Sequence, residues 1–139
     1  FPAAASSATR PCGPALCSLT PQQKIYYSGD SGYGPHFKAI GEQFGEVDLA
    51  IMENGQYDQD WKYIHMMPEE TAQAADDVHA RAVLPGHAGR FVLAKHTWDD
   101  PYKRLAEAST GRPWRLLTPM LGEPVWVADK TQSFNAWWR

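Results

Sequence analysis

Several features of specialised proteins are missing from this 139-residue chain. Its net charge of -3 lacks the basic excess with which proteins hold DNA, RNA or anionic membranes. No apolar run approaches the roughly 20 residues that cross a bilayer. The first residues show neither the basic start nor the unbroken apolar core of a signal peptide. These absences predict a globular protein of one ordinary domain.

Cysteine is also scarce, and several catalytic motifs are absent. Cys12 and Cys17 have no histidine or cysteine partners at zinc-finger spacing, and a local disulfide and free thiols both remain open. No Gly-x-Ser-x-Gly segment is present, so an α/β-hydrolase would have no nucleophile. The chain also has no Gly-x-Gly-x-x-Gly segment and no glycine-rich loop that ends in Lys-Ser or Lys-Thr. The commonest nucleotide-binding functions are therefore excluded.

The chain divides into three segments of different composition. Residues 1–23 are rich in Ala, Ser and Pro without a clear period, which predicts an irregular arm outside the fold that follows. Within 24–128, strand-like and helix-like patterns alternate, and 129–139 form an aromatic C-terminal tail. The expected strands are 24–28, 47–52, 82–84, 114–117 and 124–128, and the expected helices begin near 35, 68 and 100. This order predicts an α/β layered domain.

A glycine-rich turn that contains Asp30 follows the first expected strand. Residues 25–27 are β-branched or aromatic and suit a buried strand, and glycines around Asp30 keep its surroundings open. A carboxylate in such a turn is well placed to bind a metal or a substrate. Aspartate is also an ordinary turn former, and from this segment alone that interpretation is favoured.

Two other polar side chains follow expected strands, namely Asn54 and His87. Ligands of α/β sheets bind beyond the carboxyl ends of strands, so these residues and Asp30 are expected to meet at one edge. Carboxylate and imidazole are ordinary ligands of zinc and iron. A lone histidine after a strand is more often a hydrogen-bonded surface residue, so a metal site and a structural role both remain open.

The remaining histidines are weaker candidates. His65 stands before Met66-Met67-Pro68, where it either packs against the start of a helix or faces a substrate. His96 is a similar but weaker candidate. His36 and His79 fall on expected helices and are interpreted as ordinary helix residues.

Several longer motifs occur in a fixed order between residues 24 and 128. They are Tyr27-Ser28-Gly29-Asp30-Ser31-Gly32-Tyr33, Val47-Asp48-Leu49-Ala50, His65-Met66-Met67-Pro68-Glu69-Glu70, Leu84-Pro85-Gly86-His87-Ala88-Gly89-Arg90-Phe91 and His96-x-Trp98-x-x-Pro101. This set resembles the C-terminal half of a metallo-β-lactamase-fold hydrolase. The branch that it resembles holds RomA-like proteins and N-acylphosphatidylethanolamine-hydrolysing phospholipase D.

The resemblance implies an αββα sandwich that binds two zinc ions in its edge cleft. Asp30 matches the aspartate that bridges the metals, and His87 matches a histidine ligand of one of them. His65 matches a catalytic histidine near the substrate. The expected residues that bind substrate or support these groups are Tyr33, Asn54 and His96. The implied parent enzyme is a phospholipase D-like phosphodiesterase that uses a metal-bound hydroxide, since metals lower the pKa of water.

The family's His-x-His-x-Asp-His motif is absent, because no two histidines here are separated by one residue. Two ligands fall short of the three or four protein ligands usual for zinc. We therefore expect half of the sandwich, a truncated domain with partial or no zinc and no activity alone. A homodimer or a missing N-terminal half would cover its open sheet face. A lactonase-like hydrolase and a non-catalytic binding or structural module remain alternatives.

Partners and localisation follow more weakly from the sequence. A phospholipid or another phosphate ester is the expected substrate of the parent, and no nucleic acid is expected as a partner. The cytoplasm is the expected compartment, with only peripheral contact to a membrane and no stable insertion.

Overall fold

The computed structural model describes residues 15–91 and 93–139. A five-stranded sheet has the spatial order β1-β2-β3-β4-β5, with β1 antiparallel to β2 and the other neighbours parallel. The strands are β1 (Leu16–Leu19), β2 (Lys24–Tyr27), β3 (Leu49–Glu53), β4 (Ala82–Gly86) and β5 (Arg115–Leu116). The helices are α1 (His36–Phe44), α2 (Pro68–Asp77) and α3 (Asp100–Ala108), with a short 3-10 turn at Gln59–Trp61. The predicted α/β class is confirmed.

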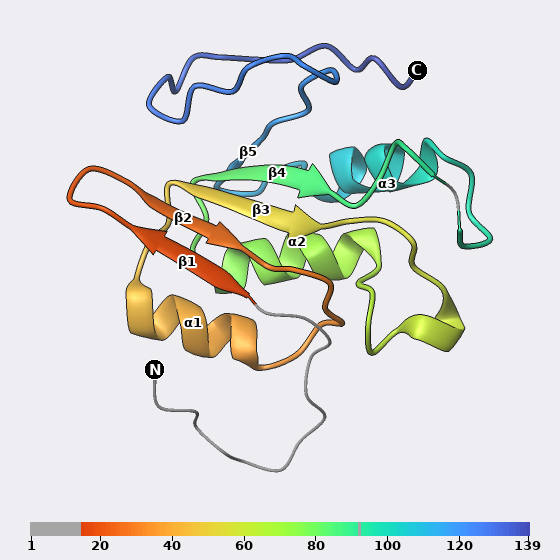
Figure 1. Cartoon of the computed structure of the whole chain (residues 1–139), viewed down its shortest axis with the longest axis horizontal. Coiled ribbons are helices and arrows are strands. Elements are labelled where there is room, and N and C mark those ends of the chain that lie inside the picture. The colour runs from red at the N-terminus through yellow and green to blue at the C-terminus, as the bar shows by residue number, and fades with distance from the viewer. Residues whose placement is uncertain (1–14, 92) are drawn as a thin grey trace.

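The main core lies between the sheet and its helices. Figure 1 shows α1 and α2 on one side of the sheet and the C-terminal segment on the other. Phe37 from α1, Met52 from β3 and Leu105 from α3 are all fully buried in this core. Their burial is the main stabilising contribution, because apolar surface removed from water contributes roughly 25 cal/mol per Å².

The opposite face of the sheet has a smaller core. Leu49, Ala82 and Leu117 are buried there, and the apolar side chains that pack on them are only partly buried. The cover comes from the irregular C-terminal segment, where Leu121 and Trp126 stay exposed. One face of the sheet is therefore well packed by helices and the other is covered only in part.

The beginnings of the helices follow from local sequence chemistry. The backbone N–H of Met67 donates to the Glu70 carboxylate at 2.9 Å, which satisfies a donor at the start of α2. Pro68 occupies the first turn, where its missing N–H costs nothing. Glu69 and Glu70 also lie at the positive end of the helix dipole. The predicted start of α2 is confirmed.

Two sequence-based expectations about strands are wrong. Residues 16–19 were expected to be irregular but form β1, because the Thr20 hydroxyl oxygen accepts the Gln23 backbone N–H at 2.9 Å and closes a hairpin onto β2. The strand expected at 124–128 does not form, because the Trp126 N–H donates to the Gln132 side chain at 2.8 Å instead of to a neighbouring strand. Cys12 lies outside the described residues. In the described ranges, no helix has the length and apolar character needed to cross a membrane.

Candidate metal and histidine site

Asp30 and His87 meet at the carboxyl edge of the sheet. Asp30 follows β2 and His87 follows β4, and both side chains are partly exposed. The Asp30 Oδ1 atom lies 3.6 Å from the His87 Nδ1 atom. His87 adopts a positive φ of 63°, which is rare for a residue with a side chain and is often found at functional sites. The predicted convergence of these two residues is confirmed in the structure.

His65 joins this pair from the long loop between β3 and α2. Its ring stacks on the His87 ring, with centroids 5.2 Å apart and planes inclined by 19°. The Trp61 ring meets His65 edge-on, with centroids 6.0 Å apart. His65 is therefore held between an aromatic ring and the second histidine.

Glu53, which sequence reasoning missed, lies behind His65. Its Oε1 atom is 3.1 Å from His65 Nδ1, and its Oε2 atom accepts the Met66 backbone N–H at 2.9 Å. Its side chain is only 1% exposed, so these donors replace part of the water that the carboxylate has lost, and burial still raises the pKa of Glu53. The sequence feature that could have indicated Glu53 is its position, because it ends an apolar strand at the same edge as Asp30.

The hydrogen bond between Glu53 and His65 has an electrostatic consequence. It raises the pKa of His65, and this effect exceeds the opposing effect of the partial burial of the ring. The nearby Asp30 carboxylate acts in the same direction. His65 therefore keeps its proton to a higher pH than an ordinary histidine.

The backbone after β3 packs directly against the His87 loop. The Asn54 N–H donates to the Gly86 carbonyl at 3.0 Å. A Cβ atom on Gly55 would lie only 2.0 Å from the His87 carbonyl oxygen, so this close approach requires glycine. The turn 53–55 thus supports both histidines, one through the Glu53 side chain and the other through its backbone.

Gln56 continues this support by joining two loops. Its side-chain N–H donates to the Phe91 carbonyl at 2.7 Å, and its side-chain oxygen accepts the N–H groups of Leu93 and Ala94 at 2.8 and 3.2 Å. Gln56 is buried, with 5% exposure. The loop that carries His65 is therefore bonded to the loop that follows His87.

Three other predicted site residues contact different parts of the molecule. The Tyr33 hydroxyl donates to Asp77 at 2.7 Å. Asn54 is fully buried, and its side-chain N–H donates to the Pro101 carbonyl at 2.9 Å. The His96 ring stacks on Tyr57, with centroids 4.2 Å apart. Asn54 thus lies behind the site, and contact of Tyr33 or His96 with a substrate stays a prediction.

The donor atoms fit a metal in type but not in number. Asp30 and His87 offer a carboxylate and an imidazole, which are ordinary zinc ligands. Among the residues that the structure describes, no group of three or more His, Cys, Asp or Glu side chains is arranged to hold a metal ion. A complete zinc site would need donors besides these two.

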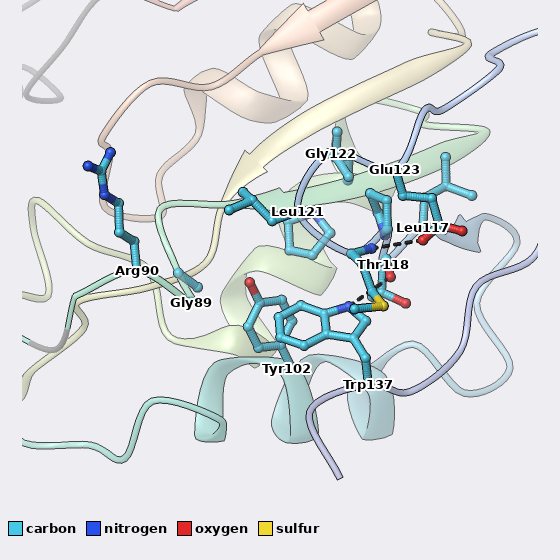
Figure 2. Close-up of a pocket in the computed structure, with 14 residues that line it drawn as sticks. Gly89, Arg90, Tyr102, Leu117, Thr118, Leu121, Gly122, Glu123 and Trp137 are labelled. Atoms are coloured by element: carbon cyan, nitrogen blue, oxygen red, sulfur yellow. Dashed lines mark hydrogen bonds between the residues drawn. The ribbon is translucent and has the colours of Figure 1, made fainter.

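An apolar pocket lies beside the loop that follows His87. Its volume is about 930 Å³, and its walls include Leu84, Gly89, Tyr102 and Trp137. Figure 2 shows Tyr102 and Trp137 close together, with Arg90 pointing away from them. The Trp137 side-chain N–H donates to a backbone carbonyl after β5 at 3.0 Å, which holds the tail against the pocket. The volume of the pocket lies in the range of small-molecule sites.

Comparison with known proteins gives a consistent set of relatives. The family model of the beta-lactamase superfamily domain matches residues 2–88, a range that includes most of the segment expected to lie outside the fold. The outer membrane protein RomA of Klebsiella pneumoniae is 90% identical over 72 residues, which cover 52% of this chain and 54% of RomA. A UPF0173 metal-dependent hydrolase of Ligilactobacillus salivarius is 32% identical over 123 residues, 84% of this chain and 53% of that protein.

Two further matches extend this set. The mitochondrial N-acyl-phosphatidylethanolamine-hydrolyzing phospholipase D of Saccharomyces cerevisiae is 36% identical over 117 residues, 80% of this chain and 24% of that protein. The crystal structure of the metallo-beta-lactamase fold protein YhfI from Bacillus subtilis aligns with a TM-score of 0.56 and 25% identity, over 73% of this chain and 39% of that chain. The matched segment therefore spans from about a quarter to about half of these proteins.

Proposed function

This chain belongs to the metallo-β-lactamase superfamily, and from that premise we propose that it carries the C-terminal part of a zinc-dependent phosphodiesterase site. The observation that carries the proposal is the meeting of Asp30, His87 and His65 at the carboxyl edge of the sheet. A carboxylate, an imidazole that can bind a metal and a second imidazole then lie within one small region. Such groups can supply metal ligands and an acid–base group, which metal-dependent hydrolysis uses.

Asp30 and His87 are the residues that would hold the metal. Their side chains are partly exposed, so a metal can reach them without unfolding the loops. When bound, zinc lowers the pKa of water and supplies a nucleophile near neutral pH. The buried turn at 53–55 keeps the His87 backbone in place, which limits the reorganisation that metal binding requires.

His65 is the proposed proton donor of the site. Its Nδ1 atom is engaged by Glu53, which leaves Nε2 free to approach a substrate. Its raised pKa keeps a larger fraction of the ring protonated near neutral pH than in an ordinary histidine. A protonated Nε2 can stabilise a phosphate and can give a proton to a departing alkoxide.

A phosphate diester is the proposed substrate class because of the phospholipase relatives. The yeast relative is named for hydrolysis of N-acyl-phosphatidylethanolamine. The apolar pocket beside the His87 loop would accept an apolar part of such a lipid. A lactone would place less negative charge near His65, so the protonated imidazole favours the phosphate.

The remaining metal ligands are proposed to come from outside the described residues. The relatives extend well beyond the segment that this chain matches, and RomA is matched over only 54% of its length. A second copy of this chain is the other source that we consider. Either source would also cover the sheet face on which only Leu49, Ala82 and Leu117 are buried. With two ligands, this chain alone is expected to bind zinc weakly.

The proposal is tested by zinc titration calorimetry and by hydrolysis of bis(4-nitrophenyl) phosphate. Weak zinc binding that is lost in Asp30→Ala and in His87→Ala supports the site. The control is His79→Asn, which removes an exposed imidazole and suits the positive φ at that position. Hydrolysis is measured with this chain alone and with the matched region placed in full-length RomA.

Three results would count against parts of the proposal. Zinc binding that survives both substitutions would contradict the assignment of the ligands. Absence of both zinc binding and hydrolysis in the full-length protein would favour a non-catalytic binding module. Hydrolysis of a lactone without hydrolysis of the phosphodiester would contradict the substrate class.

A further inference from the structure

Glu53 is a deeply buried acidic residue beside the histidines. Its carboxylate side chain is 1% exposed and receives the Met66 N–H at 2.9 Å and, more weakly, the Gly55 N–H at 3.4 Å. Burial of an ionised carboxylate is costly unless several donors surround it. The His65 Nδ1 atom approaches the same carboxylate at 3.1 Å, in addition to the two backbone donors. The carboxylate therefore contacts the imidazole as well as backbone N–H groups of the neighbouring turns.

The backbone of Glu53 is fixed on both sides. Its N–H donates to the Ser28 hydroxyl oxygen at 2.8 Å, and its carbonyl accepts the Thr71 hydroxyl at 2.9 Å. Ser28 directly follows β2 and Thr71 lies in α2, so two separate parts of the fold hold this residue. A carboxylate fixed in this way has little freedom to follow a moving imidazole. The imidazole must instead adopt the orientation that the carboxylate sets.

The ring of His65 is confined on its other sides. His87 lies against one side, with centroids 5.2 Å apart, and Trp61 meets the ring edge-on. Among the hydrogen bonds of the described residues, none involves the Nε2 atom of His65. An ionised carboxylate accepts hydrogen bonds but donates none, so it selects the ring form that carries a proton on Nδ1.

From this geometry we propose that Glu53 is a positioning residue that fixes the neutral form of His65 as the Nδ1–H tautomer, with Nε2 as its free atom. The inference deepens the proposed function, because it says which nitrogen faces the reacting groups. It assigns no contact between Glu53 and a substrate. The carboxylate acts only through the imidazole, as carboxylates behind functional histidines often do.

The test is a long-range ¹H–¹⁵N correlation NMR spectrum of the chain labelled at histidine. The experiment is recorded at alkaline pH, where the ring is neutral, and His65→Asn assigns the signal. We expect a protonated Nδ1 and a bare Nε2 in the wild-type chain. In Glu53→Gln, the amide oxygen can keep the Met66 N–H while the amide N–H₂ faces His65. The proton is then expected to move from Nδ1 to Nε2.

Glu69→Gln is the matched control. It removes the same charge from an exposed carboxylate that binds Arg104, and it should leave the His65 signals unchanged. A wild-type Nε2–H tautomer would overturn the inference, and so would an unchanged tautomer in Glu53→Gln. If Glu53→Gln does not fold, the wild-type spectrum still decides. The spectrum needs neither metal nor substrate, so its result is independent of whether zinc binds or hydrolysis occurs.

Discussion

Replacing Gly55 with alanine tests how closely the turn after β3 supports His87. The added Cβ would lie 2.0 Å from the His87 carbonyl oxygen and 2.7 Å from its carbonyl carbon. Both atoms belong to the backbone, so no flexible side chain can move aside. A Cβ atom needs at least about 3 Å here, so the two segments must separate by about 1 Å. A displacement of about this size is enough to misplace the groups of a catalytic site.

The expected loss of stability follows from the cost of overpacking. Forcing extra atoms into a packed region costs about 1–3 kcal/mol. With an m-value of about 2 kcal/mol/M, this loss lowers the midpoint of urea unfolding by about 0.5–1.5 M. The same displacement carries the His87 ring away from Asp30, now 3.6 Å distant, so the zinc affinity of the chain should fall as well.

Gly86→Ala is the matched control, because Gly86 directly precedes His87. A Cβ there meets its nearest atoms at 3.7 and 3.9 Å, which are ordinary contacts. Its midpoint should stay the same or rise by about 0.2–0.5 M, because alanine restricts the unfolded chain. Equal midpoints for Gly55→Ala and the wild type would refute the packing argument. Equal losses of the unfolding midpoint in both variants would show that a side chain near His87 destabilises the chain even where there is room for it.

Two more outcomes can be measured away from the site. Leu105→Ala should lower the free energy of unfolding by about 2–5 kcal/mol in urea titration, because Leu105 is fully buried in the main core; a loss below 1 kcal/mol would contradict that packing. The hydrogen bond to Asp77 raises the pKa of Tyr33 to about 12, above the ordinary value of 10.0. The stability from this bond should be complete below pH 10 and lost as the pH rises through 12. Absorbance titration should show this raised pKa disappear in Asp77→Asn, and an unchanged curve would refute it.

The sequence predicted the meeting of Asp30 and His87 because strand ends have a fixed geometry. Both residues come shortly after apolar strand patterns, and parallel strands bring their carboxyl ends to one edge. The role of Glu53 could not be predicted in this way. Its partner His65 lies at the end of an irregular loop of a dozen residues. No sequence pattern in such a loop indicates where the chain turns back toward the strand.

The two errors about strands also have physical causes. β1 has only four residues, and its pairing depends on a turn stabilised by the Thr20 side chain. Conversely, residues 124–128 have the composition of a strand but pair with no strand of the sheet that the structure describes, and the Gln132 side chain accepts the Trp126 N–H instead. Strand propensity describes a fit to a pleated surface, so it fails where the surface is missing.

The bonds made by Gln56 have a consequence for loop exchange between relatives. Three backbone groups, of Phe91, Leu93 and Ala94, bind this one side chain, which lies in the loop that leads to His65. A graft that replaces the loop after His87 alone would leave the buried Gln56 side chain without partners, at about 1–3 kcal/mol for each unsatisfied group. The structures of the two loops therefore depend on each other. A chimera should exchange them together, with Gln56 included, if both histidines are to keep their places.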